Sequence, residues 1–333
     1  MESKQACERI KRNMLTHDSA VAPLYVLRKD HKPCEDEQVG PPTRPVCGAN
    51  VAYNRRLSHI LSMIIKPIWR NNQNTCTSTE EMMASLKSVN DGLARTGEDA
   101  VVISLDVKAL YPSMDIEMTA GIASRMFLER GPDVSGVNTT ELGLYLAVNY
   151  DKKRDQLEAL GLADYCHTRR YKGGRPPTLT GCAVKEKEED KLKSWKLPEK
   201  YPDADTTRRM LAEALKVAIL FVMKNHLYKC CGEIRKQSKG GPIGLELTGD
   251  LAQILMIWFD EQLKQRITEE GHEAFMYERY VDDITNVLRN DWKLPGNQKG
   301  DDARALECIL RIGNNIHESL QLTGDAPSLH DKK

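Results

Sequence analysis

The chain has 333 residues, of which 40% are hydrophobic, and its 48 lysines and arginines balance 48 aspartates and glutamates. This length can bury a large core, and the neutral balance excludes a protein whose overall charge alone would attract a polyanion. No run approaches the roughly 20 apolar residues that span a bilayer, and the N-terminus lacks the pattern of a secretory signal. We therefore expect an intracellular protein without a membrane segment, with no signal that distinguishes nucleus from cytoplasm.

The first part of the chain combines basic residues with proline and glycine. Residues 23–50 alternate basic and apolar groups between turn-forming residues, which predicts short strands and turns that expose cations. Lys29, Lys32 and Arg44 lie on this candidate strand and turn, where they could grip a triphosphate, and arginine suits bidentate phosphate contact. A solvated basic face is the alternative. Residues 51–70 then predict a helix, because apolar residues recur there at spacings of three and four.

A strand and two helices are expected next. Residues 101–105 form an apolar run that predicts a buried strand, ending in Asp106 and followed by a turn at Pro112. Helices are expected at about 116–130 and 140–149. From about 151 to 205 the composition becomes charged and turn-prone, which indicates an insertion.

The last third predicts a helix, a hairpin, a second helix and a second hairpin. The helix covers about 206–224, and the first hairpin covers 227–234, broken by Gly232. A glycine-rich stretch at 237–244 leads into a helix in which apolar residues share one face: Leu247, Leu251, Ile254, Leu255 and Trp258. Residues 275–288 predict the second hairpin, with Asp282 and Asp283 in its turn.

These carboxylates are arranged as two-metal phosphoryl transfer requires. An apolar strand ends in Asp106, and a distant hairpin carries Asp282 and Asp283. Two magnesium ions about 3.5–4 Å apart need oxygen ligands on rigid elements to act on a primer hydroxyl and a leaving pyrophosphate. A solvated hairpin turn is the commoner fate of an Asp-Asp pair. The apolar neighbours Val281 and Ile284 favour the metal interpretation, because buried charges need partners.

Two further features lie near these carboxylates in the chain. Tyr111 follows Asp106 by five residues, and a ring placed beneath the sugar would clash with a 2′-hydroxyl; a core tyrosine is the alternative. The small residues from Gln237 to Gly244 allow close approach of backbone to a base or sugar, and a helix begins just after them.

Taken in order, these segments resemble the reverse transcriptases, and in particular those of Penelope-like retroelements. Five segments carry the resemblance: Leu24 to Pro33, Pro42 to Val46, Ser104 to Tyr111, Gln237 to Gly244, and Tyr280 to Asp283. The resemblance implies an α+β right-hand polymerase, an RNA-directed DNA polymerase with a fingers lobe that binds the nucleotide. Its palm would have antiparallel strands packed on helices.

The resemblance also implies roles for individual residues. The catalytic residues would be Asp106, Asp282 and Asp283, and Val107 would join them in binding metal. The nucleotide-binding residues would be Lys29, Lys32, Arg44, Tyr111 and Gln237. Template or primer contacts would involve Gly240, Gly244 and Tyr280. The implied cofactor is a pair of Mg²⁺ ions, with Mn²⁺ as an alternative, and the implied partners are an RNA template, a DNA or RNA primer and deoxynucleoside triphosphates.

Domain boundaries follow from the motif order. We expect an N-terminal extension at 1–22, fingers at 23–100, and a palm at 101–290 that carries fingers elements and the insertion. Residues 291–333 would end the palm before a thumb.

Two alternative functions stay open. An RNA-dependent RNA polymerase shares the palm geometry, although Tyr111 and the Val-Asp-Asp hairpin favour DNA synthesis. A non-catalytic nucleic-acid-binding remnant is the other, and the intact carboxylates argue against it.

Overall fold

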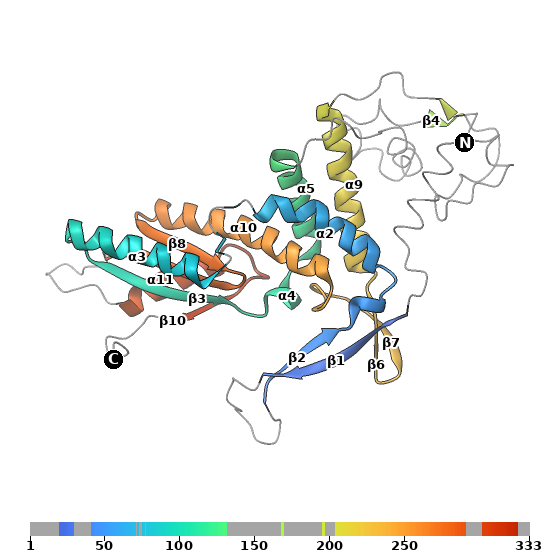
Figure 1. The fold of residues 1–333 in the computed structure, drawn as a ribbon, viewed down its shortest axis with the longest axis horizontal. Helices are drawn as coiled ribbons and strands as arrows, with labels where there is room; N and C mark the ends of the chain where they lie inside the picture. Colours follow the sequence, from blue (N-terminus) through green and yellow to red (C-terminus); the bar gives the residue numbers. More distant parts are fainter. Residues whose placement is uncertain are drawn as a thin grey trace. The chain divides into compact units, whose positions relative to one another are not determined.

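The computed structural model describes residues 20–29, 41–70, 72, 75, 76, 78–131, 168, 169, 195, 196, 204–290 and 302–325. The helix expected at 140–149, Lys32 and nearly all of the insertion expected at 151–205 lie outside these residues. The chain divides into two compact units, each described by itself. The first unit is Met1–Ile64 with Ala123–Lys236, and the second unit is Ile65–Ile122 with Gln237–Lys333 (Figure 1).

The first unit contains a four-stranded sheet. Its order is β2 (Thr43–Cys47), β1 (Ala22–Arg28), β6 (Leu227–Cys230) and β7 (Glu233–Lys236). β1 pairs antiparallel with β2 and parallel with β6, whereas β6 and β7 form a hairpin. In the hairpin turn, Cys231 and Gly232 have φ angles of 52° and 85°, so the glycine occupies a conformation that suits it. The strands predicted in 23–50 and the hairpin predicted at 227–234 are confirmed.

The helices predicted at 51–70, 116–130 and 206–224 are confirmed as well. They are α2 (Arg55–Arg70), α5 (Ile116–Arg130) and α9 (Ala204–Lys224). The first unit also contains the short η1 (Ala49–Val51), β4 (Thr168–Arg169) and β5 (Trp195–Lys196). α2 and α5 each run across the division between the units. Inside the first unit, Ser124 Oγ on α5 donates to the Ala212 carbonyl of α9 at 3.0 Å. Asn54 Nδ2, just before α2, donates to the Val222 carbonyl of α9 at 3.1 Å.

The second unit contains an antiparallel sheet. Its order is β10 (Leu322–Asp325), β3 (Ala100–Val107), β9 (Asp283–Arg289) and β8 (Ala274–Tyr280). The strand predicted at 101–105 is present, but the structure buries one face of it only. Val101, Ile103 and Leu105 are buried, while Val102 is 40% exposed, because side chains of a strand alternate between two faces.

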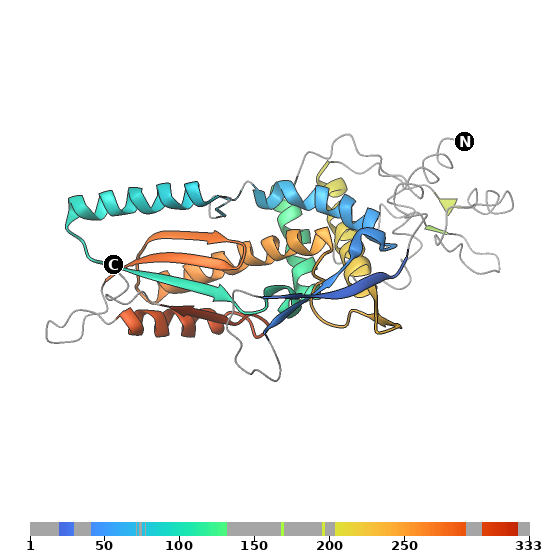
Figure 2. The same cartoon turned by 60° about the horizontal axis from the view of Figure 1, so that its bottom comes forward.

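Four helices accompany this sheet: α3 (Thr79–Thr96), α4 (Leu110–Ser113), α10 (Glu246–Glu269) and α11 (Asp302–Asn314). α3 lies beside β8 and α11 beside β10, at opposite edges of the sheet (Figure 2). The predicted apolar face of α10 is buried except for Trp258, which is half-buried. Other faces of α10 are buried too, including the polar side chains of Asp250 and Asp260. The second unit therefore has α10 as its core helix.

The expected α+β class is confirmed, since both large sheets pack with helices. Among the helices that the structure describes, none combines the length and the apolar character needed to cross a bilayer.

Candidate active site

The three candidate carboxylates meet at one end of the second-unit sheet. Asp106 is the penultimate residue of β3, and its register partner on β9 is Asp283. The backbone N–H of Val107 donates to the Asp282 carbonyl at 3.2 Å, which ties the end of β3 to the β8–β9 turn. Strand pairing thus brings together side chains that are far apart in the sequence. Val107, predicted as a metal-binding residue, is buried beside them.

The turn between β8 and β9 differs from the sequence prediction. Val281 and Asp282 form the turn, and Asp283 begins β9 opposite Tyr280, so the placement of Asp283 in the turn was wrong. The physical reason is that pairing with β3 extends β9 up to Asp283. Val281 has a φ of 57°, which a β-branched residue rarely adopts. Such backbone strain costs about 1–3 kcal/mol and persists only where the surrounding structure enforces it.

The electrostatics of this site favour a cation. The pKa of the Asp283 carboxyl is raised, first by partial burial and then by the negative charges of Asp282 and Asp106. Asp106 and Asp282 are half-buried and Asp283 is more exposed, so all three stand at a surface that solvent and ions reach. Carboxylate oxygens are the ligands that Mg²⁺ prefers, and a divalent ion would relieve their mutual repulsion. The residue types at this site are therefore ones that magnesium binds.

Sequence reasoning missed the buried polar groups beneath the turn. Arg279 on β8 is fully buried, and its Nε donates to Asp260 Oδ2 on α10 at 2.8 Å. The Tyr277 hydroxyl donates to the other oxygen of Asp260 at 2.7 Å. Burial raises the pKa of Asp260, an effect that Arg279 opposes, and it raises the pKa of Tyr277, which stays a donor. A charged residue within the apolar run 247–263 was the signal that could have indicated such a pair.

The glycine-rich stretch lies against the segment that follows β3. Gly240 has a φ of 61°, and a Cβ added there would lie 2.3 Å from the Pro112 carbonyl oxygen. The N–H of Gly241 donates to the Tyr111 carbonyl at 2.8 Å. The predicted close approach of backbone exists, but its partner in the structure is the backbone of α4. Tyr111 itself is half-buried.

Three other predicted residues surround these elements. Gln237 Nε2 donates to the Lys239 carbonyl at 2.6 Å, so its side chain folds back on the glycine-rich stretch. Gly244 has a φ of 109° and lies just before α10. Tyr280 is 52% exposed and is the register partner of Asp283. The second unit thus contains every predicted site residue except the basic ones.

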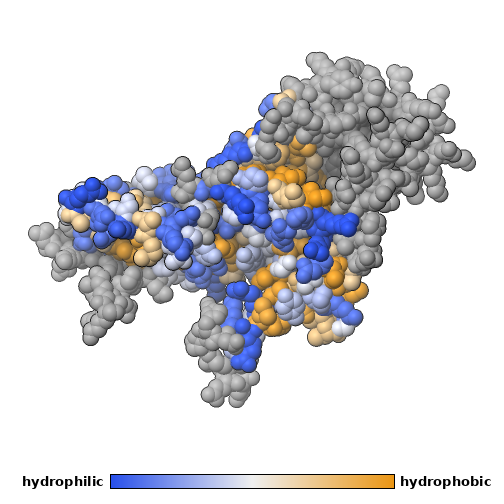
Figure 3. Space-filling view, viewed as in Figure 1, coloured by the Kyte–Doolittle hydropathy of each residue, from blue (hydrophilic) through white to orange (hydrophobic). Residues whose placement is uncertain are grey.

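Of the basic residues predicted to bind nucleotide, the two that the structure describes, Lys29 and Arg44, belong to the first unit. Arg44 is exposed on β2 opposite Leu27, and the backbone N–H of Lys29 donates to the Pro42 carbonyl at 2.9 Å. The structure therefore places Lys29 and Arg44 on one hairpin, while Lys32 lies outside the described residues. Apolar surface gathers over the same sheet (Figure 3), where β1 exposes about half of each of three consecutive side chains, Tyr25, Val26 and Leu27.

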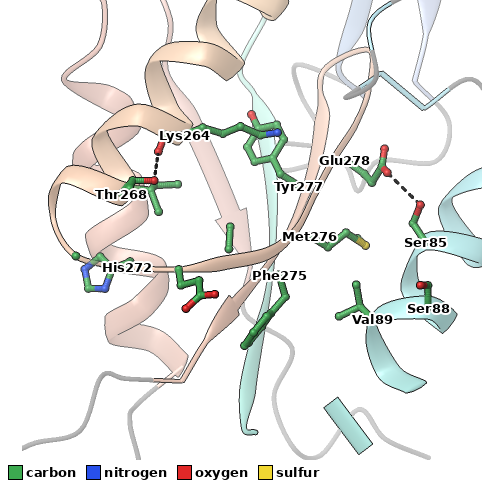
Figure 4. Close-up of a pocket in the computed structure, with 14 residues that line it drawn as sticks. Ser85, Ser88, Val89, Lys264, Thr268, His272, Phe275, Met276, Tyr277 and Glu278 are labelled. Carbon is green, nitrogen blue, oxygen red and sulfur yellow. Dashed lines mark hydrogen bonds between the residues drawn. The ribbon is translucent and has the colours of Figure 1, made fainter. Parts of the chain in front are cut away.

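A cavity of about 850 Å³ lies between α3, β8 and the C-terminal end of α10 (Figure 4). Ser85 Oγ on α3 donates to Glu278 Oε1 on β8 at 3.0 Å, and the Lys264 ammonium lies 4.6 Å from the centre of the Tyr277 ring. The strand residues in its wall are 274–278, on the N-terminal side of the turn, and none of the three aspartates forms part of this wall. The cavity is therefore separate from the carboxylates.

A mixed cluster near that cavity has the composition of a metal site. Donor atoms of Glu270, His272 and Cys308 lie within 4.8 Å of one another. However, the guanidinium of Arg311 donates to Glu270 and lies 3.4 Å from the Cys308 sulfur. Because a cation already neutralises Glu270, and lowers the pKa of its carboxyl, this cluster is an ion pair rather than a magnesium centre.

No protein-family model and no curated protein sequence matches the chain. Solved structures do. Telomerase from Candida albicans, in complex with a fragment of telomeric RNA, is 11% identical with a TM-score of 0.49, covering 99% of this chain and 47% of its own. Telomerase from Candida tropicalis is 10% identical with a TM-score of 0.49, and the match covers 98% of this chain and 44% of the telomerase. The BmCPV RNA-dependent RNA polymerase is 14% identical with a TM-score of 0.45, and the match covers 96% of this chain and 21% of the polymerase.

The chain thus spans less than half of each of these telomerases and about a fifth of the polymerase. At these identities and TM-scores the similarities establish no function, and the case for one rests on the geometry of the site.

Proposed function

We propose that the chain is an RNA-directed DNA polymerase of the reverse-transcriptase type, similar to those of Penelope-like retroelements. It adds deoxynucleotides to the 3′-hydroxyl of a DNA or RNA primer on an RNA template. The observation that carries the proposal is the register that sets Asp106 opposite Asp283, with Asp282 bonded through its carbonyl to Val107. Carboxylates from two elements at one end of a sheet are what two-metal nucleotidyl transfer needs.

Different residues of the chain would bind the metals and the triphosphate. Asp106 and Asp282 would bind the metals directly, and Asp283 would support them. Two bound Mg²⁺ ions would supply activation of the primer hydroxyl and stabilisation of the leaving pyrophosphate. Lys29 and Arg44, on an exposed hairpin, would bind the triphosphate, since arginine offers paired donors to phosphate oxygens.

The preference for deoxynucleotides is assigned to Tyr111. This residue lies in α4, the short helix that follows the strand carrying Asp106, and its carbonyl accepts a hydrogen bond from the N–H of Gly241. A backbone held in this way would keep the ring in one place, where its bulk would exclude a 2′-hydroxyl. Discrimination would then arise by steric clash.

A primer-extension assay on the full chain tests the proposal. RNA and DNA templates are each offered with deoxynucleotides or ribonucleotides, with Mg²⁺ or Mn²⁺, and with Asp106→Asn as the inactive control. We expect extension on RNA with deoxynucleotides, lost on chelation of the metal. Products made from ribonucleotides would instead identify an RNA-dependent RNA polymerase. Binding of primer-template without extension would identify a non-catalytic remnant.

A further inference from the structure

The turn that carries Asp282 is tied to the core helix through one side chain. Arg279 Nη1 donates to the Val281 carbonyl at 2.8 Å and to Gln253 Oε1 on α10, also at 2.8 Å. The Nε of the same guanidinium donates to Asp260 at 2.8 Å. A single planar group therefore joins the peptide next to Asp282 to two residues of α10.

A third segment holds the same strand. The Cys76 N–H donates to the Arg279 carbonyl at 2.9 Å, and Arg279 Nη2 donates to Thr75 Oγ1 at 3.3 Å. The guanidinium is fixed from α10 and from the segment after α2, and it holds the turn in return. Five donors in a rigid fork allow this, and a lysine ammonium on a flexible stem could not reproduce it.

Stability alone is a poor reason for these buried charges. Replacing a buried ion pair by apolar residues of similar volume is often neutral or stabilising. The turn gives a better reason, because Val281 has a φ of 57° that a valine rarely adopts, and its carbonyl is the atom that Arg279 binds. We infer that Arg279, oriented by Asp260, is a positioning residue that holds the Val281–Asp282 turn so that Asp282 faces Asp106. This inference rests on the proposed function.

The contacts of Arg279 with Asp260 and with the Val281 carbonyl are called the anchor of the turn. Two variants of the full chain remove this anchor in different ways. Arg279→Lys keeps the charge facing Asp260 but loses the fork, and Asp260→Leu/Arg279→Met replaces the pair by apolar side chains. Tyr277→Phe is the matched control, because it removes a buried hydrogen bond to Asp260 without touching the turn. Thermal unfolding shows which variants fold.

Two readouts follow the turn. Amide exchange of Val107 reports the bond to the Asp282 carbonyl, with the amides of 101–103 on the same strand as a reference. The Mg²⁺ concentration for half-maximal primer extension reports how well the carboxylates are placed. Both anchor variants should raise each quantity about tenfold, the scale of one hydrogen bond to a charged group, and excess Mg²⁺ should restore kcat.

The outcomes separate the inference from the proposed function. Wild-type exchange and metal dependence in folded anchor variants would overturn the inference, as would an equal change in Tyr277→Phe, which would mark the network as merely structural. If Val107 exchange rises in the variants but the wild type extends no primer with any metal, the anchor stands and the polymerase assignment falls.

Discussion

The two sheets of the molecule present their functional candidates in opposite ways. In the second unit the aspartates stand at the end of a sheet backed by α10, whose buried Asp260 is joined through Arg279 to the Val281–Asp282 turn. In the first unit Arg44 stands on an edge strand, and its neighbours on β1 are largely exposed. The difference fits two kinds of task. Metal ligands need fixed positions, whereas phosphate charges can be met by side chains that adjust on binding.

This comparison predicts that substitutions in the second unit have the larger effects. Asp282→Asn should reduce Mg²⁺-dependent extension at least about a thousandfold, because an amide is a poor replacement for a carboxylate ligand. Thermal unfolding should stay near that of the wild type. Asp115→Asn is the control, since asparagine caps the start of α5 as well as aspartate does. Normal activity with normal metal dependence in Asp282→Asn would remove the site assignment.

Gly240→Ala should be the next largest change, and its effect is on stability. The added Cβ would lie 2.3 Å from a backbone oxygen, at a φ of 61°, so the α4 contact must open at a cost of about 2–4 kcal/mol. The measurement is the free energy of unfolding in urea. Gly92→Ala in α3 has nothing within 4 Å and should be neutral or slightly stabilising. Equal effects of both changes would contradict the packing of Gly240 against α4.

Substitutions at Tyr111 sharpen the comparison by testing the sugar preference proposed for its ring. Tyr111→Phe should keep the preference for deoxynucleotides, whereas Tyr111→Val should reduce it about tenfold or more, because the exclusion depends on ring volume. The quantity measured is the ratio of kcat/KM for a matched deoxynucleotide and ribonucleotide. A ratio that is near unity in the wild type, or unchanged in Tyr111→Val, would make Tyr111 a packing residue and favour RNA synthesis.

Arg44→Ala tests the first unit. A charge-assisted contact to phosphate is worth roughly 1.5–3 kcal/mol, so the apparent KM for nucleotide should rise about 10- to 100-fold with little change in folding. The rise should shrink as salt increases, because Arg44 is exposed. Arg125→Ala, an exposed arginine on α5, serves as the control. An unchanged KM would mean that Arg44 belongs to a solvated basic face and does not bind nucleotide.

The smallest expected effect concerns Asp283 and pH. Its folded pKa is raised, so the protonated carboxyl favours folding at low pH, and this contribution is lost as pH rises through the raised pKa. At neutral pH without metal, Asp283→Asn should therefore raise Tm by about 1–2 °C, a small shift because the group is exposed. Added Mg²⁺ should reverse the order by stabilising the wild type more. Asp91→Asn on α3, the control, should change neither the Tm without metal nor its response to Mg²⁺. A lower Tm in metal-free Asp283→Asn would contradict the repulsion between the carboxylates.

Much of the fold could be predicted from local patterns. Periodicity located α2 and α10, and helices were also expected where α5 and α9 lie; turn residues located both hairpins. Each of these elements buries an apolar face of its own. α3 was missed for the complementary reason that none of its residues is buried. Its start carried a readable signal, since Ser78 Oγ accepts from the Glu81 N–H in a Ser-x-x-Glu arrangement.

The site was predicted only where the residues form a motif. Asp106, Asp282 and Asp283 stood out by their apolar flanks, whereas the pairing of Asp260 with Arg279 could not be read from either segment alone. Such a contact depends on how α10 packs on β8, and that packing is decided by the whole unit. The same holds for Gly240, whose partner proved to be the backbone of α4.

The central claim is that Asp106 and Asp282 bind the metals of a polymerase. Its most direct test counts Mn²⁺ bound to the chain by electron paramagnetic resonance, in the presence of a primer-template and a non-hydrolysable deoxynucleotide. We predict two ions per wild-type chain, and fewer in Asp106→Asn and in Asp282→Asn. Equal Mn²⁺ binding by the wild type and both variants would contradict it.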